Sequence, residues 1–279
     1  MKRKKFILIS LFSLLGFTLK PNKLFSFNKL STNQKMLLKI SGDTLIGHGP
    51  IKMFYPGLAL GKTDTGIASI GRIDHALFEG DTIIRMHPHV NDEILTYLRS
   101  GYVEHLDSEG FKKNLNSATL MLMKAGHSFY HEEKIINKGE PLEALQIFIR
   151  PKQKNLKPVV TFLELENTVS NNKWRLIASP TEETTLQFTS HTWIYDIKLD
   201  NNKKLTLPDL AKENLTCLLY VFNGKINVNN TIGLSKKDSL LIKNEEITIE
   251  TTEETELVLF VTDEEMEHYD DGMFSGNQA

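Results

Sequence analysis

The chain has 279 residues, enough for one large or two smaller β domains, and its 40% hydrophobic and 24% charged content is that of an ordinary globular protein. Its 33 basic and 35 acidic side chains leave a net charge of −2, so no basic surplus indicates nucleic-acid binding. Cys217 is the single cysteine, which excludes an internal disulfide and a cysteine-rich zinc site. A metal in this chain would therefore need nitrogen and oxygen ligands.

The first residues have the features of an export signal. A basic segment, Lys2 to Lys5, precedes an apolar run from Phe6 to Phe17. A membrane span needs about 20 apolar residues, so a signal peptide is favoured over a transmembrane helix, although no A-x-A cleavage site follows. We expect residues 1–35 to be a signal peptide or N-terminal leader of an exported, periplasmic protein whose mature chain has no stable membrane span. A cytoplasmic protein is the alternative.

Short β-forming runs then alternate with turn residues, as in an all-β domain. Strands are predicted at 93–98, 102–105, 118–124 and 141–150 in the first half, and at 172–180, 192–199, 217–228, 238–243, 246–251 and 256–261 in the second. Asn223-Gly224 is the strongest hairpin signal, since both residues tolerate a positive φ. No amphipathic helix of any length is predicted between residues 40 and 160.

An internal repeat links the two halves. The stretch TYLRSGYVEH around Gly101 aligns with LYVFNGKINV around Gly224, and about twenty residues further on TLMLMKAG aligns with SLLIKNEE. Such a repeat predicts two similar β-barrels in tandem. We expect an N-terminal metal-binding domain over 36–165, a C-terminal degenerate domain over 166–265, and a frayed polar tail over 266–279. Histidines lie around the first hairpin and not around its copy, so only one barrel is expected to carry chemistry.

Two residue pairs with a spacing of two are the candidates for that chemistry. His87 and His89 lie on one side of an extended strand, and Pro88 between them places the pair at a strand end or edge. Two histidines at this spacing are common by chance, so on this pair alone solvated side chains are favoured over metal ligands. His131 and Glu133 repeat the spacing on a later segment, where a surface ion pair is the alternative. Brought together across a barrel, the pairs would offer three imidazoles and one carboxylate, which suit Fe, Mn, Ni, Cu or Zn.

Other polar residues near these pairs carry weaker predictions. Glu93 would either accept a hydrogen bond that orients a ligand imidazole, without binding the metal itself, or be a solvated carboxylate at the end of a strand. His105 and Asp107 lie at the end of the strand predicted at 102–105, where a polar turn is the default explanation. His127 has the strand parity of His131, but the turn before it can displace it. No partner is identified for His48, His75, His191 and His268.

Together these motifs resemble the pirin family. The family pattern is H-P-H followed by E-x-x-T-Y, then E-H-x-D-S-x-G, then A-G-x-x-x-x-H-x-E, and the chain has all four in order between residues 87 and 133. The resemblance runs from about residue 54 to residue 158, and more loosely to about residue 262. A composite pattern of this length is far more specific than any of its parts.

The resemblance implies an all-β bicupin, that is, two tandem cupin-type jelly-roll β-barrels with a metal in the N-terminal one. It assigns His87, His89, His131 and Glu133 as ligands of a mononuclear metal, typically iron, with another first-row divalent metal as the alternative. Some members resemble quercetinases, which implies a dioxygenase that opens a flavonol-like phenolic substrate with O₂ and has Glu133 as a catalytic residue. Other members are non-enzymatic, iron-dependent redox sensors. We expect a monomer that does not bind nucleic acid directly.

Three departures from the family pattern concern the walls of the site. Val90-Asn91-Asp92 stands where many members have an arginine, a glycine and an aromatic residue. Glu132 replaces the usual serine, and His127-Ser128 replaces smaller turn residues. The expected ligands are intact, so these changes affect the identity of the substrate. The leader is unusual beside cytoplasmic or nuclear members and weighs against a regulator-binding role.

Overall fold

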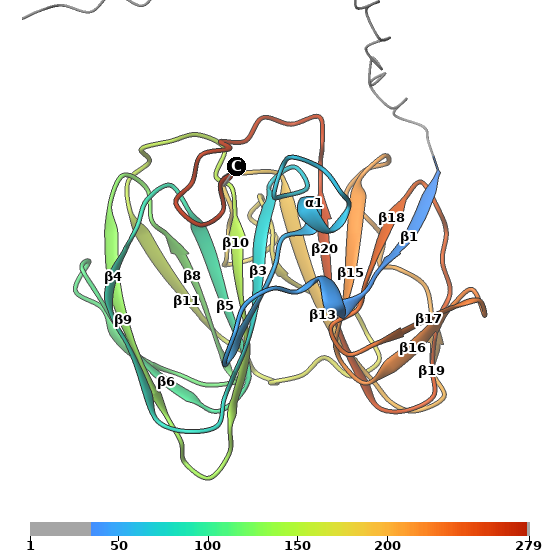
Figure 1. Cartoon of the computed structure of the whole chain (residues 1–279), viewed down its shortest axis with the longest axis horizontal. Helices are drawn as coiled ribbons and strands as arrows, with labels where there is room; N and C mark the ends of the chain where they lie inside the picture. The colour runs from blue at the N-terminus through green and yellow to red at the C-terminus, as the bar shows by residue number, and fades with distance from the viewer. Residues whose placement is uncertain (1–34, 278–279) are drawn as a thin grey trace, which may run out of the picture. The chain divides into compact units, whose positions relative to one another are not determined.

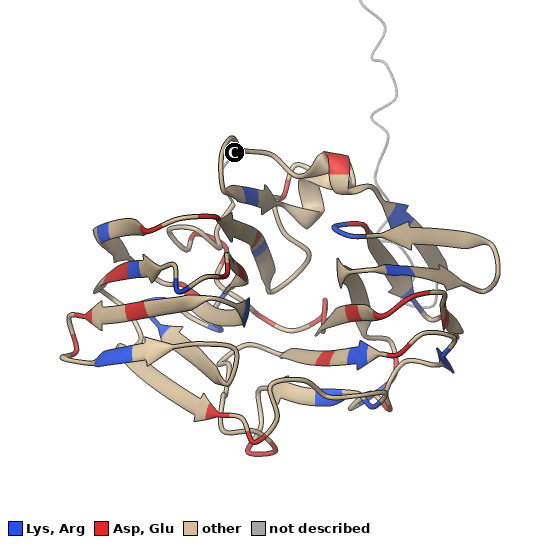
Figure 2. Cartoon of the chain, turned by 90° about the horizontal axis from the view of Figure 1, so that it is seen from below, with Lys and Arg blue, Asp and Glu red and all other residues tan. Residues whose placement is uncertain are grey.

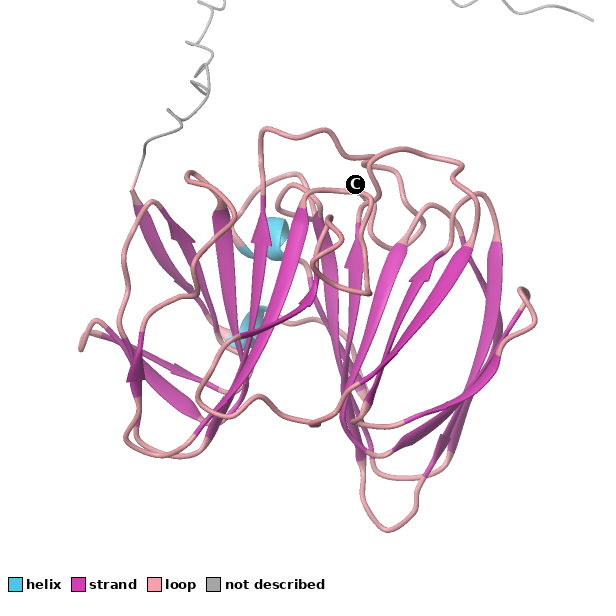
Figure 3. Cartoon of the chain, turned by 180° about the vertical axis from the view of Figure 1, so that it is seen from behind, coloured by secondary structure: helices cyan, strands magenta, loops and turns pink. Residues whose placement is uncertain are grey.

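The computed structural model describes residues 35–277. Residues 1–34, nearly all of the expected leader, lie outside this range, so the signal peptide stays a prediction. Within residues 35–277 no helix is long and apolar enough to cross a membrane. Strands dominate, and Figure 3 shows the two short helical segments, the 3₁₀ turn η1 (Gly42–Thr44) and α1 (Pro56–Ala59).

Two antiparallel β-barrels lie side by side, each built from a six-stranded and a four-stranded sheet (Figure 1). In the first barrel the sheet orders are β11-β8-β5-β10-β3-β2 and β4-β9-β6-β7. Its strands are β2 (Ile51–Phe54), β3 (Ile70–Phe78), β4 (Thr82–His89), β5 (Glu93–Ser100), β6 (Tyr102–Asp107), β7 (Lys112–Leu115), β8 (Thr119–Lys124), β9 (Phe129–Ile136), β10 (Leu142–Ile149) and β11 (Val159–Glu164). The predicted all-β fold is confirmed.

The second barrel repeats this plan with sheet orders β1-β18-β15-β20-β13-β12 and β14-β19-β16-β17. Its strands are β1 (Met36–Ile40), β12 (Arg175–Ala178), β13 (Thr192–Leu199), β14 (Lys204–Leu205), β15 (Thr216–Asn223), β16 (Lys225–Val228), β17 (Ile232–Ser235), β18 (Ser239–Lys243), β19 (Ile249–Thr251) and β20 (Thr255–Thr262). Basic and acidic positions are interspersed over both barrels (Figure 2), in keeping with the net charge of −2.

The internal repeat corresponds to equivalent hairpins of the two barrels. β5 turns into β6 at Gly101, with φ +81°, and β15 turns into β16 at Gly224, with φ +83°. The later parts of the repeat form β8 and β18, which pair with β5 and β15 respectively. Asn223 does not share the positive φ expected for it, because it still belongs to β15 and the turn needs only the glycine.

Both ends of the described chain cross to the other barrel, which the sequence did not indicate. Strand β1, inside the range expected for the N-terminal domain, pairs with β18 in the sheet of the second barrel. Residues 263–277 run back from β20 to the first barrel (Figure 1). The prediction of a frayed tail is therefore wrong for residues 266–277. The buried Arg150 binds the tail's backbone through a hydrogen bond of 3.0 Å to the carbonyl oxygen of Ser275.

The six-stranded sheets of the two barrels share one apolar core. Its buried side chains include Leu145 of β10, Tyr220 of β15 and Phe260 of β20. Hydroxyl groups join the barrels within this layer, where the oxygen of Ser69 lies 2.5 Å from that of Thr192. The shared core makes the first barrel a supported frame for the side chains inside it.

Candidate metal centre

Strand β9 sits between β4 and β6 and brings the predicted residues to one interior face. In the register of these strands His131 is opposite His87 of β4 on one side and Asp107 of β6 on the other. Glu133, two residues along β9, is opposite His105. Because strand side chains alternate, residues two apart share a face, so both i, i+2 pairs point into the barrel.

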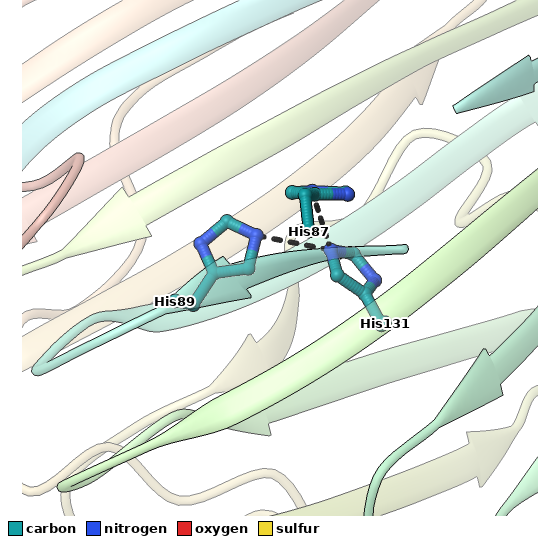
Figure 4. Close-up of side chains that lie close together, drawn as sticks. All are labelled: His87, His89 and His131. Atoms are coloured by element: carbon teal, nitrogen blue, oxygen red, sulfur yellow. Dashed lines mark hydrogen bonds between the residues drawn. The ribbon is translucent and has the colours of Figure 1, made fainter. Parts of the chain in front are cut away.

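Three imidazoles meet at the end of β4 (Figure 4). The Nε2 atom of His131 lies 3.0 Å from Nε2 of His89 and 3.0 Å from Nε2 of His87. His89 and His131 are buried, whereas His87 is partly exposed. The structure thus brings together the three histidines predicted from the sequence, with His87 on the side nearest to solvent.

This arrangement fits a first-row metal ion. One ring hydrogen on Nε2 of His131 could satisfy only one of its two contacts with other Nε2 atoms. Imidazole nitrogens bind such an ion at about 2.1 Å, so two of them at right angles lie about 3.0 Å apart. The separations of 3.0 Å between Nε2 atoms agree with that value.

The protonation of the imidazoles also suits metal binding. Nδ1 of His87 lies 2.9 Å from the carbonyl oxygen of Arg85, which places the ring hydrogen on Nδ1 and leaves the Nε2 lone pair facing the cluster. Burial lowers the pKa of His87, because a charged imidazole loses solvation there. Burial, followed by the neighbouring imidazoles, lowers the pKa of His131 far more. Neutral imidazoles are the form that binds metals.

The fourth predicted ligand, Glu133, faces the same interior but lies outside the group of three imidazoles. Its carboxylate accepts hydrogen bonds of 3.2 and 3.3 Å from the side-chain amide of Gln146. One oxygen is 3.9 Å from Nδ1 of His131, the ring nitrogen that does not contact the other two imidazoles. Burial raises the pKa of Glu133 to about 7. Its assignment as a metal ligand stays a prediction.

His105 is a site residue that sequence reasoning missed. It is fully buried and forms a second group with His131 and Glu133, whose candidate ligand atoms all lie within 4.8 Å of one another. Its Nε2 lies 2.7 Å from an oxygen of Asp107, while its Nδ1 has no hydrogen-bond partner. The polar-turn explanation holds for Asp107, whose other carboxylate oxygen accepts the backbone N–H groups of Glu109 and Phe111 at 3.0 Å, but it is wrong for His105, which lies inside β6 and faces the barrel interior. The i, i+2 spacing of His105 and Asp107 is the signal that could have found them.

Glu93 does not orient a ligand imidazole, nor is it solvated. It is 1% exposed, and its carboxylate accepts the backbone N–H of Thr189 in the second barrel at 3.2 and 2.9 Å. The carboxylate next to a candidate ligand is Asp92, with an oxygen 3.5 Å from Nδ1 of His89. His127 is exposed in the turn before β9 and lies away from the cluster.

His75 has the partner that the sequence did not reveal, at the contact between the barrels. Its Nδ1 lies 2.7 Å from the hydroxyl of Tyr220, and its Nε2 lies 2.8 Å from the carboxylate of Glu143. Burial lowers the pKa of His75. His75 therefore serves packing between the barrels and is no part of the cluster.

A small cavity adjoins Glu133 inside the first barrel. Its volume is about 40 Å³, and its lining is mainly apolar, with Thr96, Glu133 and Gln146 among the polar residues. A water molecule needs about 10–15 Å³ on this measure. The cavity therefore has room for a few water molecules beside the carboxylate.

Tandem barrels that, within residues 35–277, have clustered histidines only in the first define a bicupin with a candidate metal centre there. Residues 51–149 match the pirin family and residues 176–261 match the quercetinase C-terminal cupin domain. A Pasteurella multocida protein provisionally named quercetin 2,3-dioxygenase is 31% identical over 183 residues, which are 63% of this chain and 74% of that protein. The chain belongs to the pirin family. The quercetin 2,3-dioxygenase of Escherichia coli K12 is 26% identical over 196 residues, 70% of this chain and 83% of that enzyme.

Solved structures share the fold. YhhW from Escherichia coli superposes with a TM-score of 0.68 at 23% identity, covering 84% of this chain and all of that one. A second structure of that bacterial pirin, in complex with nickel(II), has a TM-score of 0.68 at 23% identity and covers 81% and 99%. At this identity the likeness establishes the two-barrel fold.

Proposed function

We propose that this pirin-family protein is a metal-dependent oxidoreductase of the quercetinase type, which opens flavonol-like substrates with O₂ at a mononuclear iron. The observation that carries the proposal is the convergence of the Nε2 atoms of His87 and His89 on that of His131, each at 3.0 Å. The similarity to quercetin 2,3-dioxygenases supports the reaction class. The nickel(II) bound by the Escherichia coli relative makes nickel the first alternative metal.

The residues of the site have distinct roles in this proposal. His87, His89 and His131 would hold the metal, which when bound supplies Lewis acidity toward a substrate hydroxyl and a site where oxygen can react. Glu133 lies next to His131 and can accept the proton of that hydroxyl or, after rotation, serve as a fourth ligand. Gln146 fixes the position of the Glu133 carboxylate in the structure.

The surroundings indicate the side from which a substrate approaches. The rings of Phe148 and Phe274 lie 6.2 and 4.9 Å from that of His89 and exclude water there. The interior cavity of about 40 Å³ is too small for a flavonol. His87 is the partly exposed member of the cluster, so the phenolic group would enter from its side.

Metal content is the first test, measured by mass spectrometry on chain purified without chelators. We expect about one first-row metal ion per chain in the wild type and its loss in His87→Ala. His127→Ala is the matched control, because it removes an exposed histidine in the turn before β9 and should retain the metal. Absence of bound metal, even after anaerobic loading with Fe(II), would contradict the proposal.

Oxygen uptake with quercetin then separates the enzyme from the alternative, a non-enzymatic, iron-dependent redox sensor. The enzyme consumes oxygen with the substrate, and Glu133→Gln should abolish this consumption. Metal-loaded protein that turns over no phenolic compound, but changes its partner binding between ferrous and ferric forms, would favour the sensor. Unchanged turnover in Glu133→Gln would remove that residue from the mechanism.

We also propose that the protein acts in the periplasm, because its first residues have the features of an export signal. We further propose that it is a monomer. Cell fractionation with mass spectrometry of the mature N-terminus tests export, and sedimentation tests the monomer. Recovery of the intact N-terminus in the cytoplasm would overturn the proposed location.

A further inference from the structure

We propose that the C-terminal strap, defined as residues 269–277, is a positioning element for His89 that acts through Asp92 and Phe274. The proposal rests on the proposed function, because the position of His89 matters for activity only if His89 binds the metal. The strap lies beyond residue 261, where the match to the quercetinase C-terminal domain ends.

Asp92 connects the strap to His89. Its buried carboxylate accepts the backbone N–H of Phe274 at 3.1 Å, and both the N–H and the hydroxyl of Ser275 at 2.8 and 2.7 Å. The oxygen of Asp92 that lies 3.5 Å from Nδ1 of His89 is thereby held in place from the other side. Nδ1 of His89 is buried and has no hydrogen-bond partner, so this carboxylate is the group that can stabilise a hydrogen on it.

Phe274 provides the second contact. Its ring centroid lies 4.9 Å from that of His89 and 5.8 Å from that of Phe148. The guanidinium of Arg72 lies over both phenylalanine rings, at 5.0 Å from Phe148 and 5.5 Å from Phe274. His89 is therefore packed against a ring that itself has fixed neighbours.

The strap is anchored to the first barrel independently of His89. Arg150, which is fully buried, donates to the carbonyl oxygen of Ser275 at 3.0 Å and to the carboxylate of Asp270 at 3.3 Å. The hydroxyl of Thr65 donates to the carbonyl oxygen of Gly276 at 3.0 Å. Anchors of this kind hold the strap in one position, as a positioning role requires.

The strap also explains the departure Val90-Asn91-Asp92. The carbonyl oxygen of Val90 accepts the N–H of Met273 at 2.9 Å, and the carboxylate of Asp92 accepts the N–H of Ser275 at 2.8 Å. Gly272 permits this close approach, because a Cβ there would lie 2.5 Å from the carbonyl oxygen of Asn91. The segment that differs from the family pattern is thus the segment that binds the strap.

The test compares Asp92→Asn and Phe274→Ala with the wild type, using the full chain. The first readout is the rate of release of bound Fe(II) or Ni(II) to excess chelator. We expect release to be at least about tenfold faster in Asp92→Asn, because loss of the partner of a ligand histidine typically costs 10–100-fold in metal affinity. Asp271→Asn, which removes an exposed strap carboxylate, is the matched control and should release metal at the wild-type rate.

The second readout needs no metal. The ¹⁵N chemical shifts of His89 in metal-free protein report which ring nitrogen carries the hydrogen, and a merely structural role of Asp92 would not change them. We expect Nδ1–H in the wild type and in Asp271→Asn, and a shift toward Nε2–H in Asp92→Asn.

Each outcome decides the proposal. The proposal is overturned if both test variants release metal at the wild-type rate. It is also overturned if Asp271→Asn releases metal as fast as the test variants. If the wild type binds no metal, the proposed function fails, and the His89 shifts alone decide: an unchanged pattern in Asp92→Asn overturns the positioning role.

Discussion

Replacing Glu93 with glutamine should change how the stability of the fold depends on pH. Glu93 opens β5 and is 1% exposed. Burial raises its pKa from 4.5 to about 7, although the hydrogen bonds from Thr189 and the charge of Lys124 lower it. The folded protein thus retains a proton that the unfolded chain loses above pH 4.5.

The sign and size of the effect follow from this difference in pKa. A pKa raised on folding contributes stability that is fully present below the unfolded value and is lost as pH rises through the folded value. Each pKa unit corresponds to about 1.4 kcal/mol, so the shift from 4.5 to about 7 amounts to roughly 3 kcal/mol. Glutamine does not titrate, yet its side-chain oxygen can still accept the N–H of Thr189.

The assay is urea unfolding of metal-free protein at several pH values between about 4.5 and 8, with chelator present. Glu93→Gln should resemble the wild type near pH 4.5 and exceed its free energy of unfolding by roughly 3 kcal/mol at pH 8. Glu79→Gln, which changes an exposed carboxyl group, is the control and should leave the pH dependence unchanged. Parallel curves for Glu93→Gln and the wild type would refute the reasoning.

Two further substitutions test the frame that supports the site. Gly224→Ala should lower the free energy of unfolding by more than about 1 kcal/mol, because φ is +83° and a Cβ would lie 2.5 Å from the carbonyl oxygen of Glu254; Gly233→Ala, whose Cβ would meet only one side-chain atom at 3.5 Å, should cost less, and equal losses would contradict this account. Leu145→Ala in the shared core should cost about 2–5 kcal/mol in urea unfolding, whereas the same change at Leu77, which is 38% exposed, should cost far less.

Local patterns predicted the elements and the histidine pairs, because both depend on the period-two alternation of a strand. The segment 192–199 forms β13 with those bounds, and the alternation that places His87 with His89 also places His131 with Glu133. The repeat around Gly101 and Gly224 located equivalent hairpins because each turn requires a positive φ.

Contacts between distant segments could not be predicted in this way. Nothing near Asp92 in the sequence indicates that it binds residues 274 and 275. Glu93 meets a backbone N–H of the other barrel, and His105 is placed by its register with β9. For each of these residues a local interpretation was available, as a solvated end or a polar turn, and tertiary pairing replaced it.

The two barrels show how one scaffold can separate stability from chemistry. In the second barrel, the buried apolar positions of β16 and β19 are Ile226, Val228 and Ile249, which join its apolar core. The corresponding sheet of the first barrel has buried histidines instead, and Nδ1 of His89 and of His131 lack hydrogen-bond partners.

Buried polar atoms without partners cost stability, so the Nδ1 atoms of His89, His105 and His131 destabilise the first barrel. The core shared with the second barrel and the anchored strap offset that cost. Metal binding would offset more of it, because the ion gives the clustered Nε2 atoms a common partner. On this reasoning the second barrel contributes support, and the metal-loaded protein should unfold at a higher urea concentration than the metal-free protein.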